Sequence, residues 1–457
     1  MENYAHQACI RCRSQKRKCN RLLPICFRCK RLDLPCRYHG VEADQDHPDN
    51  ADSAQPILGT LSKSMQSHVS TIIGDDKAIA LSAAVFFSTI HPWFPIINRA
   101  LYYSGLSRNS SERSPGCSLL ILCIHLLGIS PTNGTMSSRM QGLYILATGL
   151  VASLTGAEVS SIELLQARCL LSLFEVGHGM NTAAHISMGA NNRAARAMEL
   201  ASGKTDDRFR CDGNMEDAYR VRQGLTILER YIALEMGQTS DPNDLQMSNS
   251  ASISIQDEDP LLRDLLRASA SLEEVLNHIH TPTPYDVKYD EAIPLIESLV
   301  SLRDSLGKDG TPPLSCPAMA LCRSAFMVIM ENGYRLKHPP GKDCSPLSIA
   351  LLQADVDQFV SACEGLTGTM VEGDSINIPV FFVHTIGTAA LMISRHFSES
   401  RTANAVPSLQ CLKQLLEALS DRWLGAGVHL ERIHREQGQY KLEIPSVGVF
   451  IRNNALF

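Results

Sequence analysis

The sequence predicts a small metal-stabilised module at the N-terminus, followed by a large all-α domain. Six of the 15 cysteines lie in the first 40 residues of the 457-residue chain. From about residue 76 onward, apolar residues recur every three or four positions, which is the period of an amphipathic helix. The alternating pattern of half-buried strands is scarce there, so the sequence argues against an α/β enzyme core.

The first module is defined by the spacing of its cysteines. The unit Cys-x2-Cys-x6-Cys occurs twice in succession, at Cys9, Cys12, Cys19, Cys26, Cys29 and Cys36. A Cys-x2-Cys pair places two thiolates on one metal at a spacing that tetrahedral zinc accepts. The repeat therefore predicts a zinc-stapled segment.

The number of metal ions follows from the number of ligands. Structural zinc takes four ligands, and six cysteines fill two such sites only if two sulfurs bridge both metals. One zinc in a four-cysteine site, with two cysteines left over, is the second interpretation. A disulfide framework is a third, which fits poorly because no secretory signal precedes the cysteines and reducing compartments disfavour disulfides.

Charge separates this module from the rest of the chain. Its ten cations and two acids, Glu2 and Asp33, give residues 1–40 a net charge of +8, whereas the whole chain is −6 and residues 41–457 therefore carry −14. Six thiolates and two zinc ions would leave only two negative charges, which do not require ten cations. A cationic head on an acidic body is typical of a protein that binds nucleic acid.

These features together resemble the fungal binuclear zinc cluster family of transcription factors, over residues 9–36 without a gap. The resemblance implies that Cys9 and Cys26 bridge two Zn²⁺ ions, while the other four cysteines each bind one. It also implies that each half is a short helix and a strand, and that Pro24 occupies the loop between the halves. Because so small a segment has little core, zinc binding would supply its folding free energy.

The same resemblance assigns a DNA-reading residue. In that family a lysine four positions after the second cysteine reads a guanine-containing triplet, and Lys16 stands at that position here. Lysine can donate hydrogen bonds to guanine in the major groove. Arg13, Arg17, Lys18 and Arg21 are expected to hold phosphates, which set affinity and register rather than sequence.

We expect three regions along the chain. Residues 1–40 form the zinc cluster, residues 41–78 an acidic and polar linker, and residues 79–457 an all-helical regulatory domain. The linker contains apolar residues at helical spacing, Leu58, Leu61, Met65, Val69 and Ile72. A homodimer formed through this helix remains an open alternative. A coiled coil needs three or four sustained heptads, which this segment does not supply.

Helices are expected through most of the third region. The expected ranges are 117–129, 138–154, 162–176, 181–200, 225–236, 285–305, 315–333, 348–366, 378–396 and 406–420, with a further C-terminal helix around residues 429–434. Three stretches, at 87–99, at 164–179 and at 225–232, resemble the middle regulatory domain of zinc cluster transcription factors. Within them, His91 to Pro95 is interpreted as a packed turn and Glu229-Arg230 as a structural ion pair.

Several classes of protein are disfavoured. No G-x-S-x-G, G-x-x-x-x-G-K or H-E-x-x-H motif occurs, so an enzyme with a zinc-bound head is the weakest reading. His429, Glu431 and His434 have the wrong spacing for a metal site and are expected on the surface. The nine later cysteines form no Cys-x2-Cys pair and are expected to pack as small apolar residues. No segment reaches the length of apolar sequence that a membrane-spanning helix needs.

The sequence therefore predicts a zinc-dependent, sequence-specific DNA-binding regulator of RNA polymerase II transcription in the nucleus. Its expected partners are double-stranded DNA with guanine-containing triplets and the transcription machinery or co-regulators. Family resemblance suggests control of a fungal metabolic or secondary-metabolite gene cluster. The alternative is a zinc-folded protein-interaction module that does not touch DNA.

Overall fold

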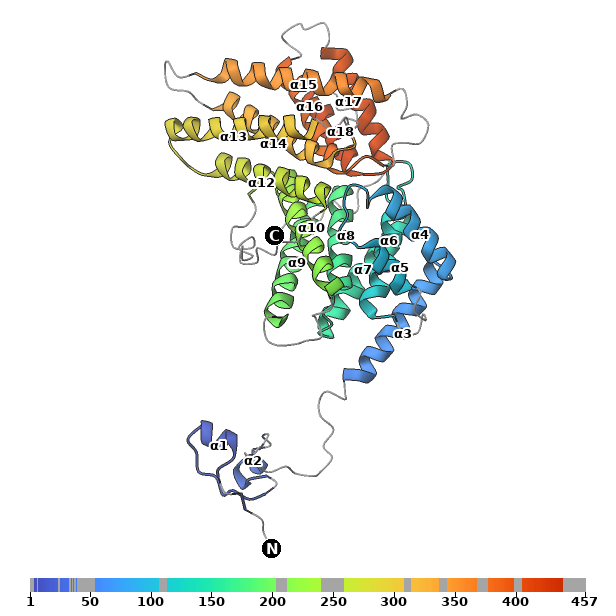
Figure 1. Ribbon diagram of the computed structural model, residues 1–457, viewed down its shortest axis with the longest axis vertical. Helices are drawn as coiled ribbons and strands as arrows, with labels where there is room; N and C mark the ends of the chain where they lie inside the picture. The colour runs from blue at the N-terminus through green and yellow to red at the C-terminus, as the bar shows by residue number, and fades with distance from the viewer. Residues whose placement is uncertain are drawn as a thin grey trace. The chain divides into compact units, whose positions relative to one another are not determined.

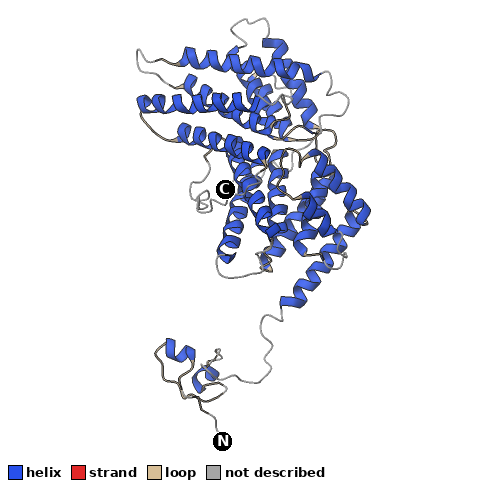
Figure 2. Cartoon of the chain, viewed as in Figure 1, coloured by secondary structure: helices blue, strands red, loops and turns tan. Residues whose placement is uncertain are grey.

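A computed structural model describes most of the chain. The described residues are 4–5, 7–23, 25–32, 34, 36, 38, 54–106, 113–202, 212–239, 259–307, 314–336, 343–367, 377–397 and 405–438. The chain divides into two compact units, Met1–Gly59 and Thr60–Phe457. Throughout the described ranges the regular elements are helices (Figure 2), which confirms the predicted fold class.

The N-terminal unit is built around sulfur. It contains two five-residue helices, α1 (Ile10–Ser14) and α2 (Phe27–Arg31). Cys9, Cys12, Cys26 and Cys29 are its buried centre. In place of the expected strands, the described residues of this unit show a single antiparallel bridge between Tyr4 and Leu22. With so few apolar side chains to bury, the unit needs another source of folding free energy.

Among the described residues, the first half of the helical unit consists of the helices α3 to α10, which Figure 1 labels. They are α3 (Ala54–Ile72), α4 (Asp76–Thr89), α5 (Arg99–Leu106), α6 (Pro115–Gly128), α7 (Ser138–Gly156), α8 (Ile162–Gly177), α9 (Asn181–Ser202) and α10 (Asp212–Met236). Helix α8 is buried from Leu164 to its end and packs against α6, α9 and α10. It is therefore the centre of this half.

The described part of the second half adds seven α-helices and a π-helical turn. They are α12 (Pro260–His280), α13 (Tyr285–Leu306), α14 (Pro317–Arg335), α15 (Ser345–Thr367), α16 (Phe381–Met392), η6 (Ile393–Phe397), α17 (Ala405–Ser420) and α18 (Gly425–Glu436). Helix α14 packs against α12, α13, α15 and α16, and α10 joins the two halves through α12.

Short polar residues fix where many of these helices begin. Asp75, Ser114, Ser137 and Ser161 each accept the backbone N–H of the third residue that follows. Such caps satisfy donors that a helix leaves free, and each contributes about 1 kcal/mol. After α8, Gly179 adopts φ +73°, a left-handed conformation that suits glycine.

Aromatic side chains fill the centre of the helical unit. Trp93 lies edge-on to both Trp423 and Phe381, with ring centroids 6.3 and 5.9 Å apart. Its indole N–H donates to the carbonyl of Thr89 at 2.7 Å, and Phe94 is fully buried. The stretch from His91 to Pro95 is therefore a packed turn, as predicted.

Most expected helices are present, with ends shifted by a few residues, except that α10 begins at Asp212 rather than at residue 225. The last part of the expected 378–396 helix is the π-helical η6. Three helices were not predicted: α4, α5 and α12. Helix α12 offered a clear signal, because Asp259 and Pro260 mark its start and Leu262, Leu265 and Leu272 follow at helical spacing.

The helical unit takes in residues expected in the linker, since it begins at Thr60 rather than at residue 79. Met65 and Val69 of α3 are buried in its core. The apolar stripe on which a coiled-coil dimer would depend is thus used within the chain.

Arg230 pairs with Glu273 of α12 at 2.7 Å, so this arginine lies in a structural ion pair between two helices. One expectation about a single residue is wrong. His429 is buried rather than on the surface, with 3% of its side chain exposed, because Glu235 of α10 gives it a charged partner inside the core.

The later cysteines follow the expectation in part. Cys123, Cys169, Cys322, Cys363 and Cys411 are buried, while Cys117, Cys316 and Cys344 are partly exposed. Cys211 and Pro24 lie outside the described residues. Among the described helices, none combines the length and apolar character needed to cross a membrane.

Candidate metal centre and nucleic-acid interface

The two short helices place their first cysteines in the same way. Cys9 and Cys26 are the N-cap residues of α1 and α2, and their sulfurs accept the backbone N–H of Cys12 and Cys29, each at 3.4 Å. The repeat in sequence is therefore a repeat in structure. In each half, the Cys-x2-Cys spacing brings a capping sulfur and a second sulfur to the same helix end.

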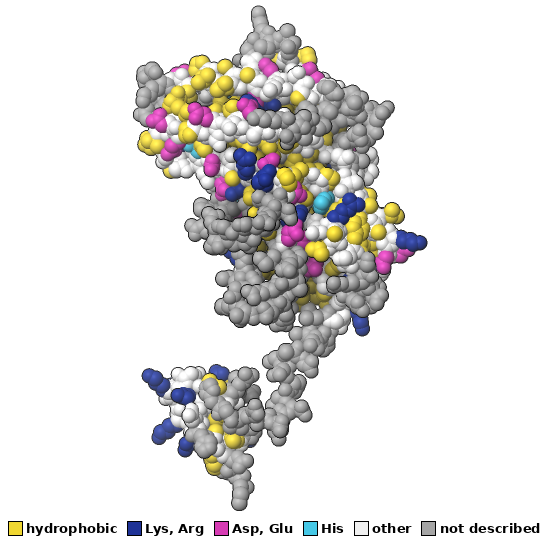
Figure 3. All heavy atoms as spheres, viewed as in Figure 1, with side chains coloured by type: hydrophobic (Ala, Val, Ile, Leu, Met, Phe, Trp, Pro, Cys, Tyr) yellow, Lys and Arg dark blue, Asp and Glu magenta, His cyan; other side chains and the backbone are white. Residues whose placement is uncertain are grey.

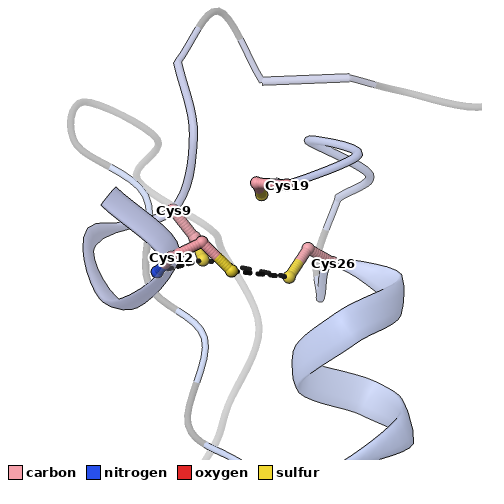
Figure 4. A group of neighbouring side chains, drawn as sticks. All are labelled: Cys9, Cys12, Cys19 and Cys26. Atoms are coloured by element: carbon pink, nitrogen blue, oxygen red, sulfur yellow. Dashed lines mark hydrogen bonds between the residues drawn. The ribbon is translucent and has the colours of Figure 1, made fainter. Parts of the chain in front are cut away.

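The six sulfurs form two groups of four that share two members. In one group, the sulfurs of Cys9, Cys12, Cys19 and Cys26 all lie within 4.8 Å of one another (Figure 4). In the other, the same holds for Cys9, Cys26, Cys29 and Cys36. The shared members are Cys9 and Cys26, one from each half.

The spacing between sulfurs fits tetrahedral zinc. The sulfur of Cys26 lies 3.8 Å from that of Cys9 and 3.8 Å from that of Cys12. The sulfurs of Cys9 and Cys29 are 3.9 Å apart. A tetrahedron with Zn–S bonds of about 2.3 Å places its sulfurs about 3.8 Å apart. The spacing among these four sulfurs therefore suits zinc.

The protein environment gives the thiols different pKa values. Burial acts to raise the pKa of Cys26, but the N–H of Cys29 and neighbouring thiols that bond to its sulfur lower that pKa to about 6. For Cys9, burial is likewise outweighed by the N–H of Cys12, so its pKa is lowered. Burial raises the pKa of Cys12 to about 12 and that of Cys36 to about 11. Of these four thiols, the two that are common to both groups ionise most readily.

Hydrogen bonds outside the sulfur groups hold the loops around them. The hydroxyl of Tyr38 donates to the carbonyl of Leu22 at 2.9 Å and lies 3.8 Å from the sulfur of Cys19. Asn20 accepts the N–H of Phe27, the first residue of α2, at 2.8 Å. The sequence analysis did not single out these two residues, because one tyrosine or one asparagine in a loop carries no pattern.

The end of α1 determines where Lys16 lies. The N–H of Lys16 donates to the carbonyl of Arg13, and the N–H of Arg17 donates to that of Cys12. This is a Schellman ending, in which the residue just past the helix adopts a left-handed conformation. Lys16 has φ 50°, a conformation that few residues other than glycine adopt readily. Its place on the backbone is therefore fixed by the turn that ends α1.

All five predicted DNA contacts are accessible. Arg13, Lys16, Arg17, Lys18 and Arg21 are exposed, and lysine and arginine side chains stand out from the N-terminal unit in Figure 3. Arg13 donates to the side chain of Gln7 at 2.9 Å. The structure brings these cations onto the segment between Cys12 and Leu22, beside the first sulfur group.

The two halves are alike in fold but not in charge. The N–H of Leu34 donates to the carbonyl of Cys29 just as that of Arg17 donates to that of Cys12, so the two helices have this bond in common where they end. At the position four after the second cysteine, the first half has Lys16 and the second has Asp33. Only the first half therefore has a cation at this position.

Comparison with known proteins agrees with this geometry. Residues 7–42 match the family described as the fungal Zn(2)-Cys(6) binuclear cluster domain. Transcription factor BOA15 of Botryotinia fuckeliana (strain B05.10) is 30% identical over 117 residues, which are 25% of this chain and 63% of that protein. The chain thus spans less than two thirds of that relative. Neither match points to an enzyme family, which agrees with the prediction. The chain carries a fungal Zn(2)-Cys(6) binuclear cluster domain at its N-terminus, ahead of an all-helical unit.

Proposed function

We propose that the N-terminal unit binds two Zn²⁺ ions and that Cys9 and Cys26 bridge them. Cys12 and Cys19 complete the first site, and Cys29 and Cys36 the second. The overlap of the two sulfur groups supports this arrangement, since it gives each metal four ligands from only six cysteines. When bound, the zinc ions supply folding free energy and take no part in chemistry.

The zinc-bound unit then acts as a sequence-specific reader of double-stranded DNA. Lys16 is the base-reading residue, donating to guanine in a triplet half-site. Arg13, Arg17, Lys18 and Arg21 hold phosphates around it. The observation that carries this proposal is the exposed cationic segment fixed against the first sulfur group, together with the absence of a matching cation at Asp33 in the second half.

At the level of the whole chain, we propose a nuclear regulator of RNA polymerase II transcription. The helical unit would relay activity to co-regulators or to the transcription machinery. The transcription-factor relative supports this role. Control of a metabolic or secondary-metabolite gene cluster is the finer proposal and rests on family resemblance. A homodimer on paired half-sites would need a surface other than the buried stripe of α3.

The competing function is a zinc-folded protein-interaction module that does not touch DNA. Exposed apolar side chains on the same unit favour it, among them Phe27 at 63% and Tyr4 at 57%. It differs from the DNA reader in one measurable respect. A protein that neutralises phosphates releases counterions, so its DNA affinity falls steeply with salt.

The test is a titration of the full chain against DNA. Sites are first selected from random duplexes, and affinity for a selected site is then measured from low to high salt. A DNA reader shows a slope of log affinity against log salt of about −0.9 per phosphate contact. Replacing Arg17 by alanine reduces the slope by about one contact. A flat salt dependence, or no enriched site, favours the interaction module.

A further inference from the structure

The helical unit has an apolar groove that DNA reading by the zinc unit does not use. Helices α13 and α15 both pack against α14, and the groove lies between them with α14 as its floor. Its volume is about 100 Å³. Sites for whole small molecules have volumes of about 300–1,000 Å³. The groove is therefore better suited to the side chains of a larger partner than to a small molecule.

Two apolar stripes form the walls of the groove. Helix α13 contributes Tyr289, Ile293 and Ile296, and α15 contributes Leu347 and Leu351. Each stripe extends over about two helical turns, roughly 10 Å. Leu347 is 60% exposed and Ile293 is 42% exposed. Exposed apolar surface with a polar rim is typical of a site for protein interaction.

The packed helices hold the two walls in place. On both walls, the residues that line the groove precede an ion pair in which Arg303 of α13 donates to Asp355 of α15 at 2.9 Å. On the floor, α15 lies close to α14 at Gly333, where a Cβ would be 2.8 Å from the hydroxyl oxygen of Ser348. Met330 of the floor is buried. The groove is thus a feature of the helical framework.

Acidic side chains follow the apolar stripe of α13. Asp290, Glu297 and Asp304 recur every seven residues, and all three are exposed. Ile293 stands three positions after Asp290 and four before Glu297, so these side chains are neighbours on the helix surface. Helix α15 contains no lysine or arginine. The described rim of the groove therefore carries acids.

The basic side chains of α13 and of the groove lining are held by the protein. The Nζ of Lys288 donates to the carbonyl of Ile279 at 2.8 Å, and Arg303 is used in the ion pair between the walls. The Nδ1 of His278 lies 3.7 Å from a carboxylate oxygen of Glu291. Burial is the largest cause that lowers the pKa of His278, so its ring is mostly neutral at neutral pH. The described rim thus presents negative charge to a partner.

We propose that this groove binds a basic amphipathic helix of a co-regulator. The proposal rests on the proposed function, in which the helical unit relays activity to co-regulators, and it names the chemistry of that partner. Apolar side chains at positions i, i+4 and i+7 of the partner helix insert between α13 and α15. Lysine or arginine side chains beside them face Asp290, Glu297 and Asp304, which sets the orientation of the helix.

The test uses the full-length protein and three synthetic peptides of about 18 residues, or five helical turns. The first is an amphipathic helix of leucine, lysine and alanine with its leucines on one face. The second has glutamate in place of every lysine, and the third has the composition of the first in scrambled order. Anisotropy of a fluorescent label on each peptide measures affinity. The first peptide is expected to bind at least about tenfold more tightly than the others, because the second brings like charges to the rim and the third has no apolar face.

Single substitutions locate the bound peptide. Leu347→Gln should weaken binding of the first peptide about tenfold, as expected for an apolar anchor at the centre of an interface. Val406→Gln, at an exposed position of α17 outside the groove, is the matched control. Glu297→Gln should weaken binding about threefold at low salt, as expected for an exposed ion pair. Glu417→Gln, at an exposed position of α17, should not.

The proposal is overturned if the acidic or the scrambled peptide binds as tightly as the first, or if Leu347→Gln leaves the affinity unchanged. It is equally overturned if no peptide binds. Sedimentation of the full chain tests another occupant: a dimer that Leu347→Gln dissociates would assign the groove to a second copy instead. DNA binding by the zinc unit is measured separately by the salt titration, so failure here leaves the DNA reader standing.

Discussion

The sulfur of Cys9 lies 3.8 Å from the sulfur of Cys26, although 17 positions separate the two residues along the chain. Each caps its own helix and accepts an N–H from the second cysteine of its own half. The two halves are therefore joined through their equivalent residues. Any metal ligated by one group of four sulfurs shares both of these ligands with the other group.

The first prediction is that the cysteines differ in how many zinc ions each one binds. Cys9→Ser removes a ligand from both proposed sites, so the chain should retain almost no zinc. Cys19→Ser removes a ligand from one site only and should leave about one zinc ion per chain, against two in the unaltered protein. Elemental analysis of the purified full chain measures the difference.

Cys344→Ser is the matched control, because this cysteine belongs to the helical unit and serine retains the hydrogen bond to the carbonyl of Gly333. It should keep both zinc ions. Equal zinc loss in the Cys9 and Cys19 variants would contradict the bridging role of Cys9.

The second prediction is that zinc binding releases protons. With the sulfurs placed as in the structure and no metal bound, burial raises the pKa of Cys12 to about 12 and that of Cys36 to about 11. Thiols of an unfolded segment, with a pKa of about 8.5, are also mostly protonated near neutral pH. Metal binding requires the thiolate. Because the metal-free state holds more protons, zinc affinity should increase as the pH rises from 6 to 9.

Calorimetric titration with zinc in buffers of different ionisation enthalpy counts the protons released. A buffer-independent heat at pH 7.5 would show that the thiols are already ionised and that the acidities inferred from the structure are wrong. Cys26, whose pKa is lowered to about 6, should contribute little to the release.

The third prediction separates the side chain of Lys16 from its backbone. Lys16→Ala should weaken binding to the selected site by about 1–3 kcal/mol and relax preference at one base. Lys16→Gly also removes the cation but suits the φ of 50° better, so it should keep or improve stability while losing the same specificity. If glycine restored specific binding, Lys16 would serve only the turn.

Arg13→Ala is the comparison for a phosphate contact. It should weaken binding to selected and random duplexes alike and reduce the salt slope by about one. Affinity measured on both kinds of duplex distinguishes the two residues. A loss confined to the selected site would give Arg13 a base-reading role instead.

Sites whose residues lie close together along the chain could be predicted from the sequence, and sites whose residues lie far apart could not. The sulfur centre was predictable because all of its members lie within 28 consecutive residues and repeat at fixed intervals. Glu235 and His429 are 194 positions apart, so no local pattern marks the pair. His429 was expected on the surface because polar residues are mostly exposed. That rule fails when the residue has a partner inside the core, as His429 has in Glu235.

The fourth prediction concerns that buried pair. The Nε2 of His429 lies 3.3 Å from a carboxylate oxygen of Glu235, and the hydroxyl of Tyr231 donates to the other oxygen at 3.1 Å. Burial alone would raise the pKa of Glu235, but His429 outweighs it and lowers that pKa to about 2. His429→Leu leaves a buried carboxylate without its partner and should destabilise the helical unit by about 3–5 kcal/mol.

The double variant Glu235→Leu/His429→Leu should recover much of that loss, because it removes the buried carboxylate together with its partner. Denaturant unfolding followed by tryptophan fluorescence isolates the helical unit, since both tryptophans of the chain, Trp93 and Trp423, are buried there. If the losses of stability in Glu235→Leu and in His429→Leu added up to the loss in the double variant, the two residues would not be coupled.

The fifth prediction is that the helical unit loses stability in mild acid. Burial lowers the pKa of His384 to about 4, and burial with nearby Arg422 lowers that of His178 to about 3. Below pH 6.5 the unfolded chain therefore binds protons that the folded unit does not, and stability falls as the pH falls. At pH 5 each histidine should contribute a loss of about 2 kcal/mol relative to pH 7.5.

His384→Asn should reduce the acid-induced loss by that amount, whereas His434→Asn, at an exposed position on α18, should not. Tryptophan-detected unfolding at the two pH values makes the comparison, and identical pH dependence in the two variants would show that His384 takes up its proton in the folded state.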